Sequence, residues 1–283
     1  MRQYKTVLGA GVVSLTTCLT ATSAYAQTPA PLAEWQYSSG IQLQRLFEPT
    51  IPTWQVEFGL GSAWMPGAPG VRRYRLQTGP AIDIRYKDVA FLSSGEGLGA
   101  NLFSFRHISV GGAFTYDLGR SPSRDRKVLE GLGTIHATPE FKIFATTVLS
   151  EAVPLTIRMD VRKQLTGPEG YIGDIGAYMP MPGSSRKFVW FVGPTLTLAS
   201  TRFMNSYFGV SHAQTKTTAF KYYKARGGLR SAGIGLSGDY FVTPHFIVNF
   251  DAAYSRLLGS AAQSPITQTP NEGILALALL YKF

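Results

Sequence analysis

The last ten residues, "ILALALLYKF" (Ile274–Phe283), are apolar except for Lys282. A helix would need about 20 residues to cross a bilayer, so this stretch is too short to do so as a helix. In a strand, successive side chains point to opposite faces. One face then carries the large side chains Leu275, Leu277, Leu279, Tyr281 and Phe283, and the other face is mostly small. This pattern predicts a strand that lies between lipid and a crowded interior.

Several other segments alternate in the same way. They are "WQVEFGL" at 54–60, "AIDIRYK" at 81–87, "LTIRMDVRKQL" at 155–165 and "FIVNFDAAY" at 246–254. Each is close to the length of about 9–11 residues that a tilted membrane strand requires. A soluble β-sandwich would also alternate, so the connections between the strands must separate the two classes.

We expect about twelve strands, an even number typical of outer-membrane barrels. They lie near 54–64, 79–87, 89–94, 97–105, 108–118, 138–150, 154–166, 170–181, 187–199, 226–242, 245–257 and 273–283.

The lengths of the connections favour a membrane barrel over a sandwich. With the N-terminus in the periplasm, short connections fall on the periplasmic side, near 87–88, 106–107, 151–153, 182–186 and 243–244. The long connections, 65–78, 119–137, 200–225 and 258–272, fall on the outer side, with two short ones near 95–96 and 167–169. Short periplasmic turns and long outer loops are typical of a transmembrane antiparallel β-barrel of the outer-membrane type, so we predict this all-β class.

The composition agrees with a β-rich exported protein. Charged residues make up 16% of the chain, below the usual value of about 25% for soluble domains. The chain has 30 Gly and 12% aromatic residues, which favours strands and turns. The net charge of +10 suggests contact with acidic surfaces such as lipopolysaccharide phosphates, and nucleic acid is not expected as a partner of an exported protein.

Residues 1–26 are predicted to be a cleaved signal peptide. Arg2 and Lys5 precede the apolar stretch "VLGAGVVSL", and Ala24 and Ala26 form an A-x-A cleavage site before Gln27. The alternative is a lipoprotein modified at Cys18, the only cysteine of the chain, although Thr directly before it fits that signal poorly. Cleavage after Ala26 would leave a mature chain without cysteine, and hence without disulfides or thiolate ligands.

The remaining chain is predicted to have two parts. Residues 27–53 are proline-rich and are expected to be a periplasmic lead-in or a partial plug, and residues 54–283 form the barrel. The last strand must pair with the first, because an open edge in lipid leaves unpaired backbone groups. Leu279, Tyr281 and Phe283 also resemble the C-terminal signal read by the barrel insertion machinery, which is therefore an expected partner.

Several stretches resemble the MipA/OmpV family of Gram-negative outer-membrane proteins. They are "GPAIDIRYKD", "GEGLGANL", "TYDLGR", "FVGPTLTLAS", "FMNSYFGVS", "ARGGLRSAGIGLSGDYFVTPHF", "RLLGSAAQSPI" and the terminal "YKF". The likeness covers most of the chain from about Trp54 and is most specific from Phe191 to Pro265. It implies a non-enzymatic barrel in the cell outer membrane.

The resemblance also implies a function and partners. The best-known family member is a scaffold that links a lytic transglycosylase to a penicillin-binding protein in murein synthesis, and other members look like adhesins or permeability factors. The region before Trp54, where a periplasmic partner would dock, resembles the family least. The expected function is a peptidoglycan scaffold, and the alternative is an outer-membrane pore or permeability factor.

A third possibility is an outer-membrane acyl hydrolase. His107 and Ser109 form a His-x-Ser pair whose side chains share one face of a strand, as a base and a nucleophile would. The pair is predicted near a periplasmic turn, whereas such enzymes act at the outer leaflet, and no third residue is evident to orient the histidine. We therefore expect no catalytic site.

No metal or cofactor is expected. The histidines at 136, 212 and 245 lack the spacing of metal ligands. The Gly-rich stretch 95–99 lacks the strand-loop-helix context of a nucleotide site, so a turn or a kink in the barrel is expected there.

Alternation places a set of charged side chains in the lumen: Glu57, Asp83, Arg85, Asp117, Arg158, Asp160, Arg162, Asp239 and Asp251. They could set the ion preference of a pore. We favour a mixed-sign network that fills the barrel, since about twelve strands leave little free bore. In the longest outer loop, the aromatic stretch 202–214 leaves two alternatives open: a short helix over the barrel mouth, or contact with a ligand or surface.

Overall fold

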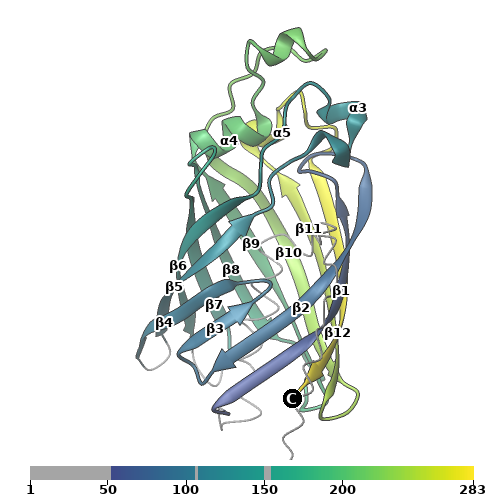
Figure 1. Ribbon diagram of the computed structural model, residues 1–283. Coiled ribbons are helices and arrows are strands. Elements are labelled where there is room, and N and C mark those ends of the chain that lie inside the picture. The colour runs from purple at the N-terminus through teal and green to yellow at the C-terminus, as the bar shows by residue number, and fades with distance from the viewer. Residues whose placement is uncertain (1–51, 106–107, 150–153) are drawn as a thin grey trace, which may run out of the picture.

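The computed structural model describes residues 52–105, 108–149 and 154–283, which form one closed barrel of twelve antiparallel strands (Figure 1). The strands are β1 (Trp54–Pro66), β2 (Tyr74–Tyr86), β3 (Ala90–Ser93), β4 (Gly97–Phe105), β5 (Ile108–Asp117), β6 (Thr138–Val148), β7 (Thr156–Gln164), β8 (Tyr171–Pro180), β9 (Phe188–Ala199), β10 (Gly228–Phe241), β11 (Phe246–Leu257) and β12 (Asn271–Lys282). Each strand pairs with its neighbours in the chain, and β1 pairs with β12. The predicted fold class and strand number are confirmed.

The connections sort to the two ends of the barrel. At the end that carries the C-terminus they are short, as between β2 and β3 or between β10 and β11 (Figure 1). At the opposite end, the connections between β5 and β6, between β9 and β10 and between β11 and β12 are long and carry helices. The β1–β2 connection at this end carries none, and those between β3 and β4 and between β7 and β8 are short. This is the predicted arrangement of short turns and long loops.

One predicted boundary is wrong. The sequence predicted a long loop at 65–78, but β1 and β2 pair as far as Pro66 and Tyr74. The backbone N–H of Gly67 donates to the carbonyl of Arg73 and closes the hairpin. Gly70 at φ 80° supplies the left-handed residue that this turn needs. The turn therefore lies earlier and is tighter than the composition of the stretch indicated.

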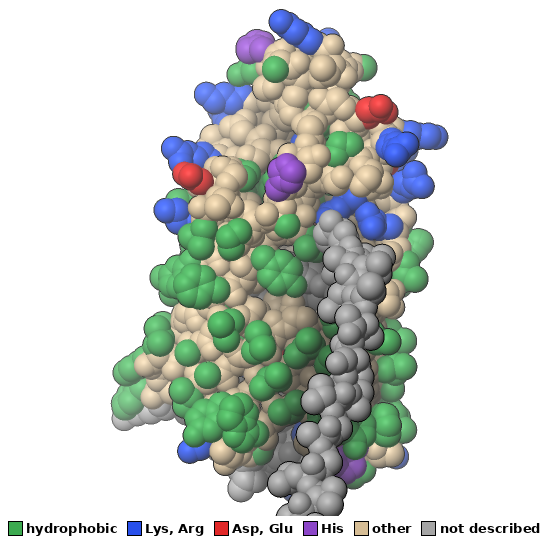
Figure 2. All heavy atoms as spheres, viewed as in Figure 1, with side chains coloured by type: hydrophobic (Ala, Val, Ile, Leu, Met, Phe, Trp, Pro, Cys, Tyr) green, Lys and Arg blue, Asp and Glu red, His purple; other side chains and the backbone are tan. Residues whose placement is uncertain are grey.

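Burial alternates along the strands as a membrane barrel requires. On β12, Leu275, Leu277 and Leu279 are 64%, 52% and 60% exposed, whereas Ala278 and Leu280 are each 4% exposed. Hydrophobic side chains cover the wall in Figure 2, and Lys and Arg gather at the end with the long loops. The exterior thus matches hydrocarbon, and polar groups are turned inward.

The long loops form a folded cap over one end of the barrel. Its helices are η2 (Pro122–Arg124), α3 (Arg126–Leu129), α4 (Thr201–Phe208), η3 (Gln214–Lys216) and α5 (Gly259–Ala262). Ser200 caps α4, since its side chain accepts a hydrogen bond from the backbone N–H of Phe203. The stretch 202–214 thus includes a short helix over the mouth, one of the two alternatives considered.

The cap has its own apolar packing. The buried side of α4 packs against α5 in one cluster, and a second cluster joins the 67–73 loop to α3 and the loop after α4. Their fully buried members include Met204, Phe208, Leu129 and Val71. None of the helices within the described ranges has the length and hydropathy to cross a membrane.

Gly59 lies at the seam that closes the barrel. A Cβ built on Gly59 would lie 1.8 Å from the backbone oxygen of Leu279 on β12. Two residues further, a Cβ on Gly61 would meet nothing closer than Ala278 Cβ at 3.6 Å. Only the first position therefore requires glycine for β1 to approach β12.

Gly59→Ala is expected to lower the stability of the closed barrel by about 2 kcal/mol or more, since the strands must shift apart in a packed wall. The measurement is the fraction of protein that migrates as the compact, heat-modifiable band after refolding. Gly61→Ala is the matched control and should refold like the wild type. Equal refolding of the two variants would contradict the claim that β1 needs glycine at position 59 to pair with β12.

Candidate functional site

Nine charged residues were predicted to face the lumen, and the structure places them inside the barrel. Seven of them are less than 10% exposed: Glu57, Asp83, Arg85, Arg158, Asp160, Arg162 and Asp251. Asp117 and Asp239 also point inward, and both are half-buried. The strands bring acidic and basic groups together across the lumen.

A first group of ion pairs spans the lumen from β2 to β7. Arg85 Nε lies 2.8 Å from Asp83 Oδ1, and Arg85 Nη2 lies 3.0 Å from Glu96 Oε2. The other oxygen of Glu96 lies 3.0 Å from Arg158 Nη2. The guanidinium of Arg158 also lies over the ring of Phe144, 4.6 Å from its centroid. Glu96 thus bridges two arginines from distant strands.

Sequence reasoning did not identify Glu96 as a site residue. It lies in the Gly-rich stretch predicted as a turn, and that turn does lie between β3 and β4. Because β3 has only four residues, the turn lies partway up the wall instead of at its rim. Glu96 therefore enters the lumen and is 1% exposed. An acidic residue between two glycines after a short strand was the available signal.

A second group of ion pairs joins β7, β8 and β9. Arg162 Nε lies 3.1 Å from Asp160 Oδ1, and Arg162 Nη2 pairs with Asp174 Oδ2. The hydroxyl of Thr197 donates to the other oxygen of Asp174. Buried charges in such a low-dielectric interior are costly unless they are paired. Removing one partner would leave the other as an uncompensated buried charge and would destabilise the fold.

The β1, β10 and β11 side of the lumen is acidic, and two of its carboxylates, those of Glu57 and Asp239, accept hydrogen bonds from side-chain amides. Gln55 Nε2 donates to Glu57 at 2.9 Å, and Asn249 Nδ2 donates to Asp239 at 2.9 Å. Asp251 lies opposite Ser237 in the β10–β11 register. Together with the arginine groups, these side chains fill the central part of the barrel.

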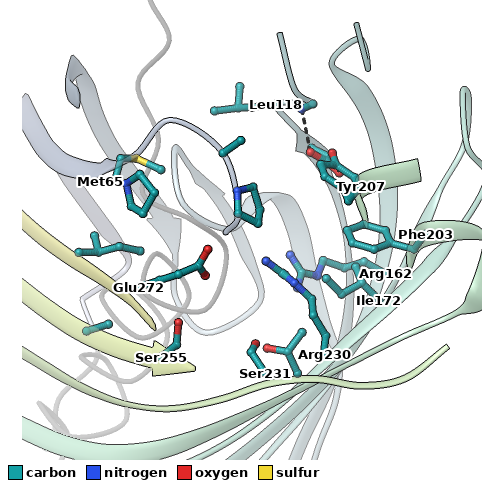
Figure 3. A pocket seen from close by; sticks show the side chains of 18 of the residues that line it. Met65, Leu118, Arg162, Ile172, Phe203, Tyr207, Arg230, Ser231, Ser255 and Glu272 are labelled. Carbon is teal, nitrogen blue, oxygen red and sulfur yellow. Dashed lines mark hydrogen bonds between the residues drawn. The ribbon is translucent and has the colours of Figure 1, made fainter. Parts of the chain in front are cut away.

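A cavity of about 230 Å³ lies between this network and the cap. Figure 3 shows Arg162 and Arg230 pointing into it, with Glu272 on the opposite side. Apolar side chains on its walls include Met65 and Phe203.

Helix α4 is fixed to the barrel at the edge of this cavity. Tyr207 Oη donates to Asp117 Oδ2 at 2.6 Å, and Gln164 Nε2 donates to the same oxygen at 2.8 Å. Burial and the neighbouring Asp117 carboxylate raise the pKa of Tyr207 well above its usual value, so its hydroxyl stays a donor. Arg120 Nη1 also donates to the carbonyl of Tyr207 at 2.7 Å.

The residues of the hydrolase hypothesis are only partly described. His107 lies outside the described residues. Ser109 is buried, and its hydroxyl lies 2.9 Å from that of Ser104. His136, His212 and His245 are all exposed. No group of three potential metal ligands occurs in the described part of the chain.

Two other sets of predicted residues concern export and assembly. The cleavage residues Ala24, Ala26 and Gln27 lie outside the described residues. The terminal residues lie on β12 and just after it, where Leu279 pairs with Leu60 and Tyr281 with Phe58. The backbone N–H of Phe283 donates to the carbonyl of Val56 at 3.0 Å.

A closed barrel with an apolar exterior, a charged lumen and long loops at one end defines the class of outer-membrane β-barrel proteins. Residues 58–283 match the model of the family described as MltA-interacting protein MipA. The chain belongs to this family, and the predicted resemblance is confirmed.

Solved structures with a similar fold are distant. An outer membrane channel from Pseudomonas putida F1 shares 10% identity at a TM-score of 0.41, covering 83% of this chain and 97% of that one. The NanC porin shares 8% identity at a TM-score of 0.40, covering 81% and 100%. Neisserial surface protein A shares 10% identity at a TM-score of 0.26, covering 83% and 99%. Comparison with curated protein sequences gives no match.

Glu96→Gln is expected to lower the free energy of unfolding by about 3 kcal/mol, because Arg158 loses its buried counter-charge. The measurement is a urea titration of the folded protein in vesicles. Glu169→Gln is the matched control: its ion pair with Arg202 spans 3.8 Å and both side chains are more than half exposed. That control should change stability by less than about 1 kcal/mol. Equal unfolding of the two variants would argue against a structural role for the Glu96 bridge.

Proposed function

We propose that the protein is a non-enzymatic outer-membrane scaffold for complexes that synthesise and remodel peptidoglycan. The observation that carries the proposal is the filled lumen: Glu96 and its partners join β2 to β7 across the barrel, below a cap with its own apolar core. A barrel filled in this way serves as a membrane-embedded platform. The description of the family as MltA-interacting protein supports a partner among murein-cleaving enzymes.

The end with the short turns is the surface proposed to meet periplasmic partners. It carries the exposed cations Lys87, Arg186 and Lys187 around its rim. Exposed charges on a surface favour encounter with a partner of opposite charge. The partners proposed here are a lytic transglycosylase and a penicillin-binding protein.

The test places a photoreactive amino acid at Lys187 in living cells and identifies crosslinked proteins by mass spectrometry. Lytic transglycosylases or murein synthases should be captured from this position. Lys221, exposed on the cap, is the matched control and should capture none of them. The scaffold would be contradicted if Lys187 captured only the barrel insertion machinery.

A pore or permeability factor is the second candidate, and one observation favours it. The cavity below the cap shows that the lumen is not filled along its whole length. Under this alternative, the ion pairs would rearrange to admit a solute, and the barrel would conduct.

A further inference from the structure

The barrel wall is incomplete between β2 and β5. Strand β3 pairs with β2 only at Asp83–Tyr86, and the β4–β5 ladder reaches no further than Leu98 and Phe114. Beyond this level, the rest of β2 pairs only with β1, and residues 115–117 of β5 pair only with β6 in the described part of the chain. Figure 1 shows β3 and β4 ending low on the wall between β2 and β5.

The sequence of β2 is suited to an open edge. The backbone N–H of Ile82 points toward β3 and donates to Ser94 Oγ at 2.8 Å. Since direction alternates along a strand, the next residue that would point an N–H to this side is Pro80. Proline has no N–H, so it leaves one donor fewer to satisfy at the edge.

The cavity below the cap reaches this gap. Its lining includes Gln77 on β2, Gly95 in the β3–β4 turn, and Thr115 and Tyr116 on β5. Tyr116 is 39% exposed and belongs to the outward-facing set of β5, which includes Phe114. Residues on both edges of the gap, together with the turn at its lower end, thus line the cavity, so the cavity lies directly behind the gap in the wall.

Arg230 is the cavity arginine whose guanidinium makes no direct hydrogen bond or salt bridge among the described residues. A β-bulge between Leu229 and Ser231 interrupts the β9–β10 register at Arg230, and bulges of this kind redirect side chains. Figure 3 shows the Arg230 side chain pointing into the cavity. Its Nε has no hydrogen-bond partner among the described residues, and its charge interacts with Glu272 across the cavity without a direct hydrogen bond or salt bridge.

The other charged side chains that line the cavity include Arg162, Arg124 and Glu272, and each of these has a hydrogen-bond or ion-pair partner. Arg162 pairs with Asp160 and Asp174, and Arg124 Nη1 donates to the carbonyl of Gly119 at 3.0 Å. Glu272 accepts a hydrogen bond from the backbone N–H of Gly70. Arg230 is therefore the group best placed to bind an incoming anion.

We propose that this cavity binds a single-chain anionic amphiphile of the fatty-acid class, which enters from the bilayer through the gap between β2 and β5. The carboxylate would accept hydrogen bonds from Arg230, which can bind it through two parallel N–H groups. The chain would lie against Met65, Ile172 and Phe203. The volume of about 230 Å³ favours one chain over a lipid with several, since sites for larger ligands span about 300–1,000 Å³. This inference does not depend on the scaffold function.

The test uses a palmitic acid analogue with a diazirine in mid-chain, added to the full-length mature protein in vesicles. After illumination, labelled positions are identified by mass spectrometry. Cavity residues Met65 and Phe203 should be labelled, and Arg230→Gln should reduce this labelling about tenfold, as loss of a charge-assisted hydrogen bond implies. Arg230→Lys should retain most of it.

Two controls are built into the design. Arg226→Gln changes an exposed arginine in the same loop-to-strand region and should leave cavity labelling unchanged. Leu275 faces lipid and should be labelled equally in every variant, which reports the amount of probe in the bilayer. The palmityl alcohol analogue, which lacks the charge, should label Leu275 but not the cavity.

Two results would overturn the proposal. The first is equal cavity labelling by the acid and the alcohol, or equal labelling of the wild type and Arg230→Gln. Either would show that Arg230 does not bind the carboxylate of the probe. A photoreactive residue at Tyr116 that crosslinks to residues 27–51 of the same chain would assign the cavity to that segment instead of a lipid.

Discussion

Saturation of backbone hydrogen bonds in hydrocarbon is the constraint on which this structure depends. No water is present in the bilayer core, so an unpaired strand edge there is costly, and pairing of the edges is the general requirement. The pairing of β1 with β12 meets this requirement at the ends of the chain. It also explains the C-terminal sequence, whose large side chains cover the outside while its small ones allow a crowded interior. Gly59 follows from the same constraint, because the two strands approach most closely where a side chain would collide with the Leu279 carbonyl.

The closed wall determines what happens to polar side chains inside it. Charged residues that point inward leave bulk water, and this is costly unless they are paired or hydrogen-bonded. Glu96 forms ion pairs with two arginines, Arg85 and Arg158. Asp160 and Asp174 form ion pairs with Arg162. The short hairpin β3–β4 supplies Glu96 from partway up the wall. The same short hairpin leaves β2 and β5 without a strand between them, so one local shortening of the sheet explains both the central network and the lateral gap.

Much of this fold could be predicted because a strand with lipid on one face and the lumen on the other must alternate apolar and polar or small side chains. The alternation in "LTIRMDVRKQL" identified both the lipid face and the inward set Arg158, Asp160 and Arg162. Three features were not predicted: the residue at which β2 begins, the position of Glu96 in the lumen, and the direction of the Arg230 side chain. Each depends on the register between strands. The register sets where the β1–β2 turn closes, how long the β3–β4 hairpin is, and where a bulge interrupts the pairing of β9 with β10. These are set by pairing between strands, which periodicity along one strand does not report.

Buried ion pairs beneath a packed cap close the lumen. Ionic conductance of the refolded wild-type protein in a planar bilayer tests this closure most directly, with insertion verified by heat-modifiable migration of protein recovered from the same vesicles. Conductance is expected to stay at the level of protein-free bilayers at neutral pH. A stable, ohmic current that scales with the amount of inserted protein would contradict it and would favour the pore.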